Sequence, residues 1–513
     1  MSTNYNFERT FILRTMSRHI NYALAFLVLF CLSIVTPYAA NRVRLKDTAA
    51  QKETYYRYRV SLRDKQLTHY SIECPEVYLS AKSIARRERF DLPVDSTDLP
   101  VCQEYKKQIR ALGFPIVLES KWQNTVVIAV TDTSALVGLR QLPFVSKIRR
   151  VFSSANTSGE ATNSLEESSL YKRQTLIKTV QSTRDVSYYG YAHEQTKMTK
   201  RDTLNALGYT GRGISVAVID AGFQNVDSLP AFKHLDVAGT RNFNRTSISS
   251  LKNGALPDDH VYDKSEHGTK VLSCMASDSP HKIVGTAYDA TYYLIRSEDE
   301  MTESLYEMDT YAAALEYADS VGVQLINSSL GYFSFDDSRD NLRLRDLDGE
   351  STFISRQASM VASKGMLLVC SAGNSGDDAW KKITPPADAK NVLVVGAVRK
   401  DSLLAAFSSV GCTVDGRIVP SVVTQGEDLA VLSSSGWVTH ASGTSFAAPQ
   451  IAAALTCMMQ AYPDISPTQW IALVEHCSNL SEFPNNIYGY GIPNFKKLYI
   501  LLQKHKVSSI LHD

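Results

Sequence analysis

The chain has 513 residues, of which 44% are hydrophobic, and its 54 basic residues nearly balance its 53 acidic residues. A chain of this length and apolar content buries at least one large core. The balanced charge gives no reason to expect nucleic acid as a partner. The 26 glycines and 17 prolines are ordinary contents, and they exclude a collagen-like or mainly low-complexity protein.

Residues 1–40 have the pattern of an export signal. Several arginines precede an apolar run at 22–35, which is short for a membrane span, and small residues follow it. We therefore predict a signal peptide and an exported protein, either periplasmic or extracellular. An inner-membrane anchor is the less favoured alternative, which stays open because Tyr38 fits the cleavage pattern poorly.

The eight cysteines are scattered and show no C-x-x-C spacing. Cys31 lies in the predicted signal, which leaves seven in the rest of the chain. This pattern indicates neither a metal site nor a disulfide scaffold. Most of them are interpreted as small core residues, with one or two bridges left open.

Residues 54–152 are predicted to form a small α+β unit. The alternation at 55–62 indicates a strand. Further strands are predicted at 116–119, 125–130 and 145–152, and helices at 79–90, 99–112 and 134–142. Strands and helices in this order predict a split βαβ, ferredoxin-like arrangement.

A polar stretch at 153–199 has the composition of a linker. The larger domain, at 200–500, contains continuous apolar runs that alternate with helical patterns. The runs are at 214–219, 324–326, 366–369 and 392–395, and the helical patterns include 307–318 and 351–362. Strands that are apolar on both faces predict an α/β fold with a parallel sheet and helices on both sides.

Two residues in this domain are candidates for acid–base chemistry. Asp220 follows a buried strand and precedes a small residue and a glycine, at the strand end where α/β sheets place their sites. His267 begins a helical segment and supplies an imidazole that accepts protons near neutral pH. Each residue alone also fits a structural role, as a turn-capping carboxylate or a helix-start histidine.

A serine nucleophile is predicted at Ser445, in the segment SGTSFAAP. It begins a helix built from small residues, and a helix N-terminus stabilises negative charge on a nucleophile or an oxyanion. Pro449 is tolerated in the first turns of such a helix. The alternative is a capping serine on a core helix.

Taken in the order Asp, His, Ser, the segments AVIDAGF, EHGTKV and SGTSFAAP resemble the subtilisin-like serine peptidases. The resemblance covers residues 200–497. SKWQNTV, LINSSLGY and YGYGIPNF, together with AVIDAGF, resemble the members from Bacteroidetes-type bacteria. The resemblance implies a secreted serine endopeptidase whose catalytic triad is Asp220, His267 and Ser445.

The same resemblance assigns the oxyanion donor and the substrate-binding segments. Asn374 would donate its amide N–H to the oxyanion, and its alternative role is that of a turn residue. An extended peptide would pair with two segments by strand addition. These segments are Ser329, Leu330 and Gly331 on one side and Ser371, Ala372 and Gly373 on the other, with the floor of the primary pocket near 384–387.

The expected partners are a peptide or protein substrate and the chain's own N-terminal unit. By resemblance, the unit at 54–152 is a pro-region that assists folding and inhibits the enzyme inside the same molecule. No cofactor and no metal are predicted. An insert at 244–264 contains Asp258, Asp259 and Asp263, and a solvated loop is favoured there over a structural calcium site.

Two other classes of function remain as alternatives. One is a catalytically silent peptide-binding protein on the same fold. The other is an export-associated chaperone in which the N-terminal unit is the functional part. Because every position of the catalytic pattern is filled, the sequence favours the peptidase.

Overall fold

The computed structural model describes residues 54–155, 187–244 and 260–511. The predicted signal at 1–40, Cys31 with it, most of the predicted linker, and Asp258 and Asp259 lie outside these ranges. Within them, no helix is both long enough and apolar enough to cross a membrane. The seven cysteines of the described part are all free, and five of them are buried as predicted for core residues.

The N-terminal unit is a four-stranded antiparallel sheet with the strand order β2-β3-β1-β4. Its strands are β1 (Tyr56–Leu62), β2 (Ile116–Ser120), β3 (Thr125–Val130) and β4 (Val145–Ser153), and its helices are α2 (Ala81–Arg89), α3 (Gln103–Ala111) and α4 (Leu136–Arg140). This order confirms the ferredoxin-like prediction. Its apolar core joins β1 and β3 to α3 and α4 through buried residues such as Val60, Ile109, Ile128 and Leu139.

The larger domain is built on a seven-stranded sheet with the order β13-β12-β11-β10-β5-β9-β6. Every neighbouring pair is parallel, as predicted. The strands are β5 (Ser215–Asp220), β6 (Asp236–Asn242), β9 (Thr291–Arg296), β10 (Leu325–Ser328), β11 (Leu367–Ser371), β12 (Leu393–Val398) and β13 (Val422–Gln425). The strand order reverses between β5 and β10, and such a switch point opens a crevice at the carboxyl ends of the strands.

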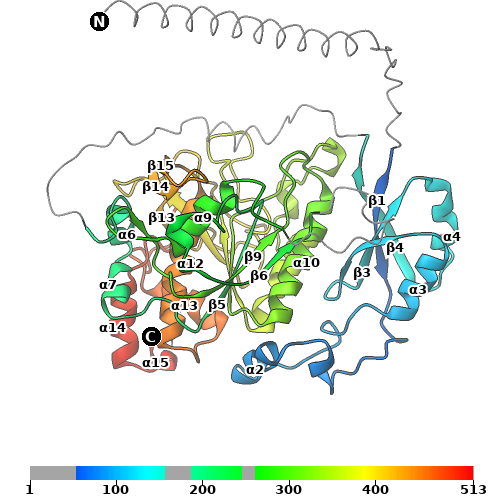
Figure 1. Cartoon of the computed structure of the whole chain (residues 1–513), viewed down its shortest axis with the longest axis horizontal. Coiled ribbons are helices and arrows are strands. Elements are labelled where there is room, and N and C mark those ends of the chain that lie inside the picture. Colours follow the sequence, from blue (N-terminus) through cyan, green and yellow to red (C-terminus); the bar gives the residue numbers. More distant parts are fainter. Residues whose placement is uncertain (1–53, 156–186, 245–259, 512–513) are drawn as a thin grey trace, which may run out of the picture. The chain divides into compact units, whose positions relative to one another are not determined.

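Helices cover both faces of this sheet (Figure 1). One face carries α9 (His267–Ala276) and α12 (Thr444–Ala461), and the other carries α10 (Leu305–Val321) and α11 (Phe353–Ser359). β5 serves both layers, because successive strand side chains point to opposite faces. Val216 and Val218 join the α12 side, whereas Ala217 and Ile219 join the α10 side. β5 therefore lies at the centre of the domain.

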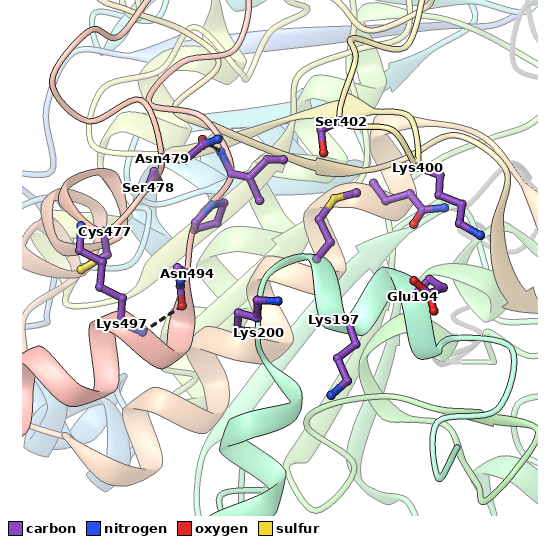
Figure 2. Close-up of a pocket in the computed structure, with 14 residues that line it drawn as sticks. Glu194, Lys197, Lys200, Lys400, Ser402, Cys477, Ser478, Asn479, Asn494 and Lys497 are labelled. Carbon is purple, nitrogen blue, oxygen red and sulfur yellow. Dashed lines mark hydrogen bonds between the residues drawn. The ribbon is translucent and has the colours of Figure 1, made fainter. Parts of the chain in front are cut away.

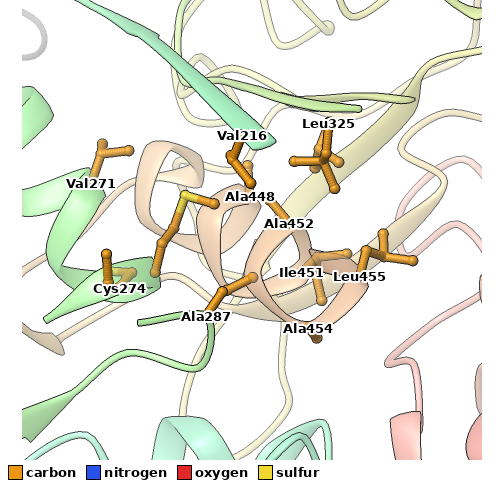
Figure 3. Packing of buried hydrophobic residues seen from close by; sticks show 14 of the residues in the cluster. Val216, Val271, Cys274, Ala287, Leu325, Ala448, Ile451, Ala452, Ala454 and Leu455 are labelled. Carbon is orange, nitrogen blue, oxygen red and sulfur yellow. The ribbon is translucent and has the colours of Figure 1, made fainter. Parts of the chain in front are cut away.

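The α12 layer is packed mainly by small side chains (Figure 3). Ala448, Ala452 and Ala454 are fully buried and alternate with larger residues such as Ile451 and Leu455. Alanine keeps high helix propensity while it lets a helix approach the sheet closely. The start of α12, which contains Ser445, is thereby held firmly against the strands.

The peptidase-like domain begins earlier than the sequence predicted. Residues 187–199, which were assigned to the linker, contain α6 (His193–Met198). The amide of Gln195 donates to the backbone O of Ala430 at 3.0 Å and accepts from its backbone N at 2.9 Å. A polar residue in this segment thus bonds to backbone groups of the folded domain. Polar composition alone made the segment resemble a linker, so the predicted end of the linker is too late.

The larger domain also contains α7 (Asp202–Ala206) before β5, and the short hairpin β7 (Asp278–Ser279) and β8 (Ile283–Val284) after α9. Its C-terminal part adds the hairpin β14 (Leu429–Leu432) and β15 (Val438–Ala441) and the helices α13 (Pro467–His476), α14 (Phe495–Lys504) and α15 (Val507–Leu511). On α13, burial raises the pKa of Glu475 to about 7, although a hydrogen bond with Ser421 opposes the shift. The folded protein therefore keeps a proton on Glu475 that the unfolded chain releases at lower pH. The stability that this proton provides is lost as the pH rises towards 7.

We predict that Glu475→Gln stabilises the protein at pH 8 more than at pH 4.5, because glutamine resembles the protonated carboxyl group and avoids burying its charge. Thermal unfolding of both proteins at the two pH values measures this difference. Glu482→Gln, at an exposed position, is the matched control. An equal shift in melting temperature at both pH values for Glu475→Gln would contradict the prediction.

Candidate functional site

Asp220 lies at the carboxyl end of β5, beside the switch point of the sheet. Its side chain is fully buried. The Oδ1 atom accepts a hydrogen bond from the backbone N of Ala221 at 2.8 Å and lies 2.7 Å from Nδ1 of His267. Sequence reasoning named both residues, and the structure brings them into direct contact although they are 47 positions apart.

His267 is the first residue of α9, and its position depends on a close approach of two backbones. A Cβ atom on Gly268 would lie 2.2 Å from the backbone O of Gly222, in the turn that follows Asp220. Only glycine allows this approach. On the other side, the His267 ring packs against Phe446, with ring centroids 5.6 Å apart. Phe446 follows Ser445 in the chain, so this contact places the imidazole against the residue next to the predicted nucleophile.

Ser445 lies in the first turn of α12, and its backbone carbonyl accepts a hydrogen bond from outside the helix that sequence reasoning missed. Pro449 explains why this carbonyl is available. Pro449 has no N–H to donate to the carbonyl of Ser445, four residues before it in the helix. That carbonyl instead accepts a hydrogen bond from Ser329 Oγ at 2.9 Å. The residue after β10 therefore completes the first turn of α12 and positions its backbone. Ser445 Oγ itself lies 3.3 Å from the backbone O of Ser329, a long contact for two oxygens.

Asn374 lies beside the start of α12, as the oxyanion assignment requires. Its Oδ1 accepts hydrogen bonds from the backbone N of Thr444 at 2.8 Å and from Thr444 Oγ1 at 2.9 Å. These bonds fix which side of the amide is oxygen, so that Nδ2 is the group left to donate. Thr444 is thus a positioning residue that the motif contained but sequence reasoning did not single out.

The two predicted substrate-binding segments follow neighbouring parallel strands. Ser329, Leu330 and Gly331 follow β10, and Ser371, Ala372 and Gly373 end or follow β11. Thr384 lies close to both segments. A Cβ on Gly331 would lie 2.1 Å from Thr384 Oγ1, and one on Gly373 would lie 2.7 Å from it. Thr384 therefore holds the two segments at a defined separation, where the floor of the primary pocket was predicted.

A cavity of about 550 Å³ lies elsewhere, among α6, the start of α14 and the loops beside them (Figure 2). Lys197, Lys200, Lys400 and Lys497 line it, and none of the predicted site residues does. Among the described residues, no cluster of three or more histidine, cysteine or acidic side chains is arranged to hold a metal ion. The candidate calcium residues Asp258 and Asp259 are outside the described ranges.

Comparison with known proteins finds two matching families. The Subtilase family, Peptidase S8, matches residues 211–491. The Peptidase S8 propeptide domain of the Bacteroidota matches residues 57–186. This second match covers the unit that the sequence predicted to be a pro-region.

The chain is also similar to individual subtilisins. Subtilisin DY of Bacillus licheniformis is 27% identical over 303 residues, which are 58% of this chain and 94% of that protein. Subtilisin NAT of Bacillus subtilis subsp. natto is 26% identical over 294 residues, 57% of this chain and 66% of that protein. The family match spans more than half of the chain and agrees with the motifs and the parallel sheet. The chain therefore belongs to the Subtilase family of serine endopeptidases and carries an S8 propeptide domain of the Bacteroidota type.

Proposed function

We propose that this peptidase is exported and that it cleaves peptide bonds through a triad of Asp220, His267 and Ser445. The observation that carries the proposal is the 2.7 Å contact between Asp220 Oδ1 and His267 Nδ1. With the Nδ1 proton directed to the buried carboxylate, Nε2 is the nitrogen left to accept a proton. Export is supported by the basic and apolar pattern of residues 1–40.

In the proposed reaction, Ser445 Oγ attacks the carbonyl carbon of the substrate while His267 takes the hydroxyl proton. His267 then donates that proton to the leaving amine, and Asp220 stabilises the imidazolium between the two steps. The long contact from Ser445 Oγ to Ser329 O is weak enough for the hydroxyl to turn to the imidazole. Water repeats the sequence on the acyl-enzyme and releases the second product.

Two donors are proposed to hold the oxyanion that forms on the carbonyl oxygen. One is Nδ2 of Asn374, which the bonds from Thr444 to Asn374 Oδ1 leave available. The other is the backbone N–H of Ser445, in the first turn of α12, where the N–H groups of a helix have no partner within the helix. These side chains and backbone groups complete the chemistry without a cofactor.

The substrate is proposed to be an extended peptide that pairs with Ser329–Gly331 and Ser371–Gly373. The N-terminal unit is proposed to inhibit the enzyme by lying along the same side. Its last strand, β4, reaches the loop that follows Gly331, where Arg149 pairs with Asp340 at 3.2 Å and Arg150 with Asp337 at 2.5 Å.

We predict that Ser445→Ala abolishes hydrolysis of casein, a fall of more than about 10⁴-fold, because the nucleophile is lost. The melting temperature stays unchanged, since only a hydroxyl with one weak contact is removed. Ser442→Ala, in the same segment, is the matched control and keeps its activity. Full peptidase activity in Ser445→Ala would show that the assignment is wrong.

A second prediction concerns Ser329→Ala. It leaves the carbonyl of Ser445 without its partner, which costs about 1–3 kcal/mol when the group is buried. We expect a lower melting temperature and a lower kcat, because the first turn of α12 is no longer held in place. Ser329→Thr keeps the hydroxyl and should recover most of both. If Ser329→Ala retains kcat and stability at the level of the parent, the bond has no positioning role.

A further inference from the structure

The propeptide domain contains a segment that a ferredoxin-like fold does not need. Residues 63–102, here named the arm, separate β1 from α3 and contain α2. In a split βαβ fold, the first strand leads directly to a helix that packs on the sheet, and α3 occupies that place. The arm instead makes its own contacts with the peptidase domain.

A buried carboxylate of the peptidase domain is the centre of these contacts. Asp319, in the last turn of α10, is fully buried. Its Oδ1 lies 2.5 Å from Nη2 of Arg86 and 2.8 Å from Nη1 of Arg87, both on α2. Its Oδ2 lies 3.2 Å from Nζ of Lys121. Burial by itself would raise the pKa of Asp319, but Lys121, Arg86 and Arg87 hold it below its ordinary value.

A buried cation of the peptidase domain, Lys364, also reaches into the arm. Nζ of Lys364 lies 3.0 Å from Oδ2 of Asp98, whose other oxygen lies 2.8 Å from Nη2 of Arg87. The side chains of Arg87, Asp98 and Lys364 are at most 2% exposed. Arg86 also donates to three backbone carbonyls, those of Val323 at 2.5 Å, Lys364 at 3.0 Å and Asp319 at 3.4 Å. Negative and positive side chains thus alternate in one buried network, in which the outer members, Asp319 and Lys364, belong to the peptidase domain and the inner members, Arg87 and Asp98, belong to the arm.

The peptidase backbone is shaped to receive the arm. Gly322 ends α10 with a φ of 87°, and a Cβ there would lie 2.3 Å from the Cβ of Lys82. Gly365 has a φ of 82°, and a Cβ there would lie 3.2 Å from Cγ of Arg86. Both positions thus combine a left-handed turn, which favours glycine, with close contact to the arm.

The surface that receives the arm lies at the opposite end of the sheet from the substrate-binding segments. Val323 precedes β10 and Lys364 precedes β11, whereas Ser329 follows β10 and Ser371 ends β11. These strands are parallel, so the arm contacts their amino ends and the substrate segments lie at their carboxyl ends. At about 3.3 Å per residue the two places are roughly 20 Å apart.

We propose that the arm is an additional anchor for the propeptide domain, independent of the substrate cleft, and that its buried ion network slows the dissociation of the propeptide domain after the junction is cut. The proposal rests on the inhibitory role proposed above. A domain held at several separate places stays bound when one contact opens, because the others keep it at high local concentration. The sheet of the propeptide domain also contacts α10, through the buried pair of Arg59 with Asp309 and the hydrogen bond from Ser120 to Glu316. Breaking one partner of a buried ion network is strongly unfavourable, so loss of the arm contacts should speed the release.

The test measures dissociation of the domains without any catalysis. In a Ser445→Ala background, a recognition site for an unrelated site-specific protease is inserted between residues 155 and 187. After the cut, the release of the propeptide domain from an immobilised peptidase domain is followed with time. The compared proteins are the parent, Arg86→Ala with Arg87→Ala, and Arg89→Ala. Arg89 is the matched control, because it lies on the same helix but its side chain is 44% exposed and 3.9 Å from Asp464.

After the cut, we expect the propeptide domain to stay bound in the parent and in Arg89→Ala, and to leave both proteins at the same slow rate. In the double variant it should dissociate at least about 100-fold faster. Asp319→Asn tests the same network from the peptidase side with an unchanged arm, and it should also dissociate at least about 10-fold faster. This second variant decides the matter if the double variant fails to fold. Rates for both within threefold of Arg89→Ala would overturn the proposal.

The outcome is separable from the proposed function. Dissociation is measured on an inactive background, whereas the peptidase activity is measured on the chain with Ser445 intact. Fast release in the network variants, together with no activity in the intact chain, would refute the proposed function but support the anchoring role of the arm. Normal activity, together with unchanged release rates, would support the proposed function but refute the anchoring role.

Discussion

The contact between Asp220 and His267 is the interaction on which the rest of the site depends. It joins the end of β5, an interior strand beside the switch point of the sheet, to the start of α9, and both groups are buried. An imidazole held by a buried carboxylate has one defined tautomer, and the nitrogen left over faces a defined direction. The close approach of the backbones at Gly268 and Gly222 fixes the position of His267, and the ring of Phe446 packs against its imidazole. The backbone therefore contributes to this geometry together with the side chains.

The parallel strands give the domain two functional ends. Their carboxyl ends carry Asp220, the segment after β10 and the segment after β11, and Ser329 there completes the proline-interrupted first turn of α12. Their amino ends carry the surface that binds the arm. The same two strands, β10 and β11, therefore run from the buried ion network to the predicted substrate-binding segments.

The sequence predicted the parallel sheet and the ferredoxin-like unit, because buried strands leave local patterns. Its motifs also named Asp220 and His267, which the structure brings into contact. The sequence did not predict the interface of the arm. Arg86 and Arg87 belong to a charged helical pattern that is typical of a solvated surface, and their partner Asp319 is more than 230 positions away. The bond from Ser329 to the Ser445 carbonyl was missed for a similar reason. Pro449 showed which carbonyl lacked a partner, but no local pattern names the donor.

Reaction of the processed enzyme with a fluorophosphonate probe tests the central claim most directly, because such probes phosphonylate a serine that a neighbouring base activates, with fluoride as the leaving group. After digestion, the account predicts the label on the peptide that contains Ser445, and labelling more than about 100-fold slower in His267→Ala and in Asp220→Ala. A label on another serine, or equal labelling of Ser445 in His267→Ala, would contradict the account.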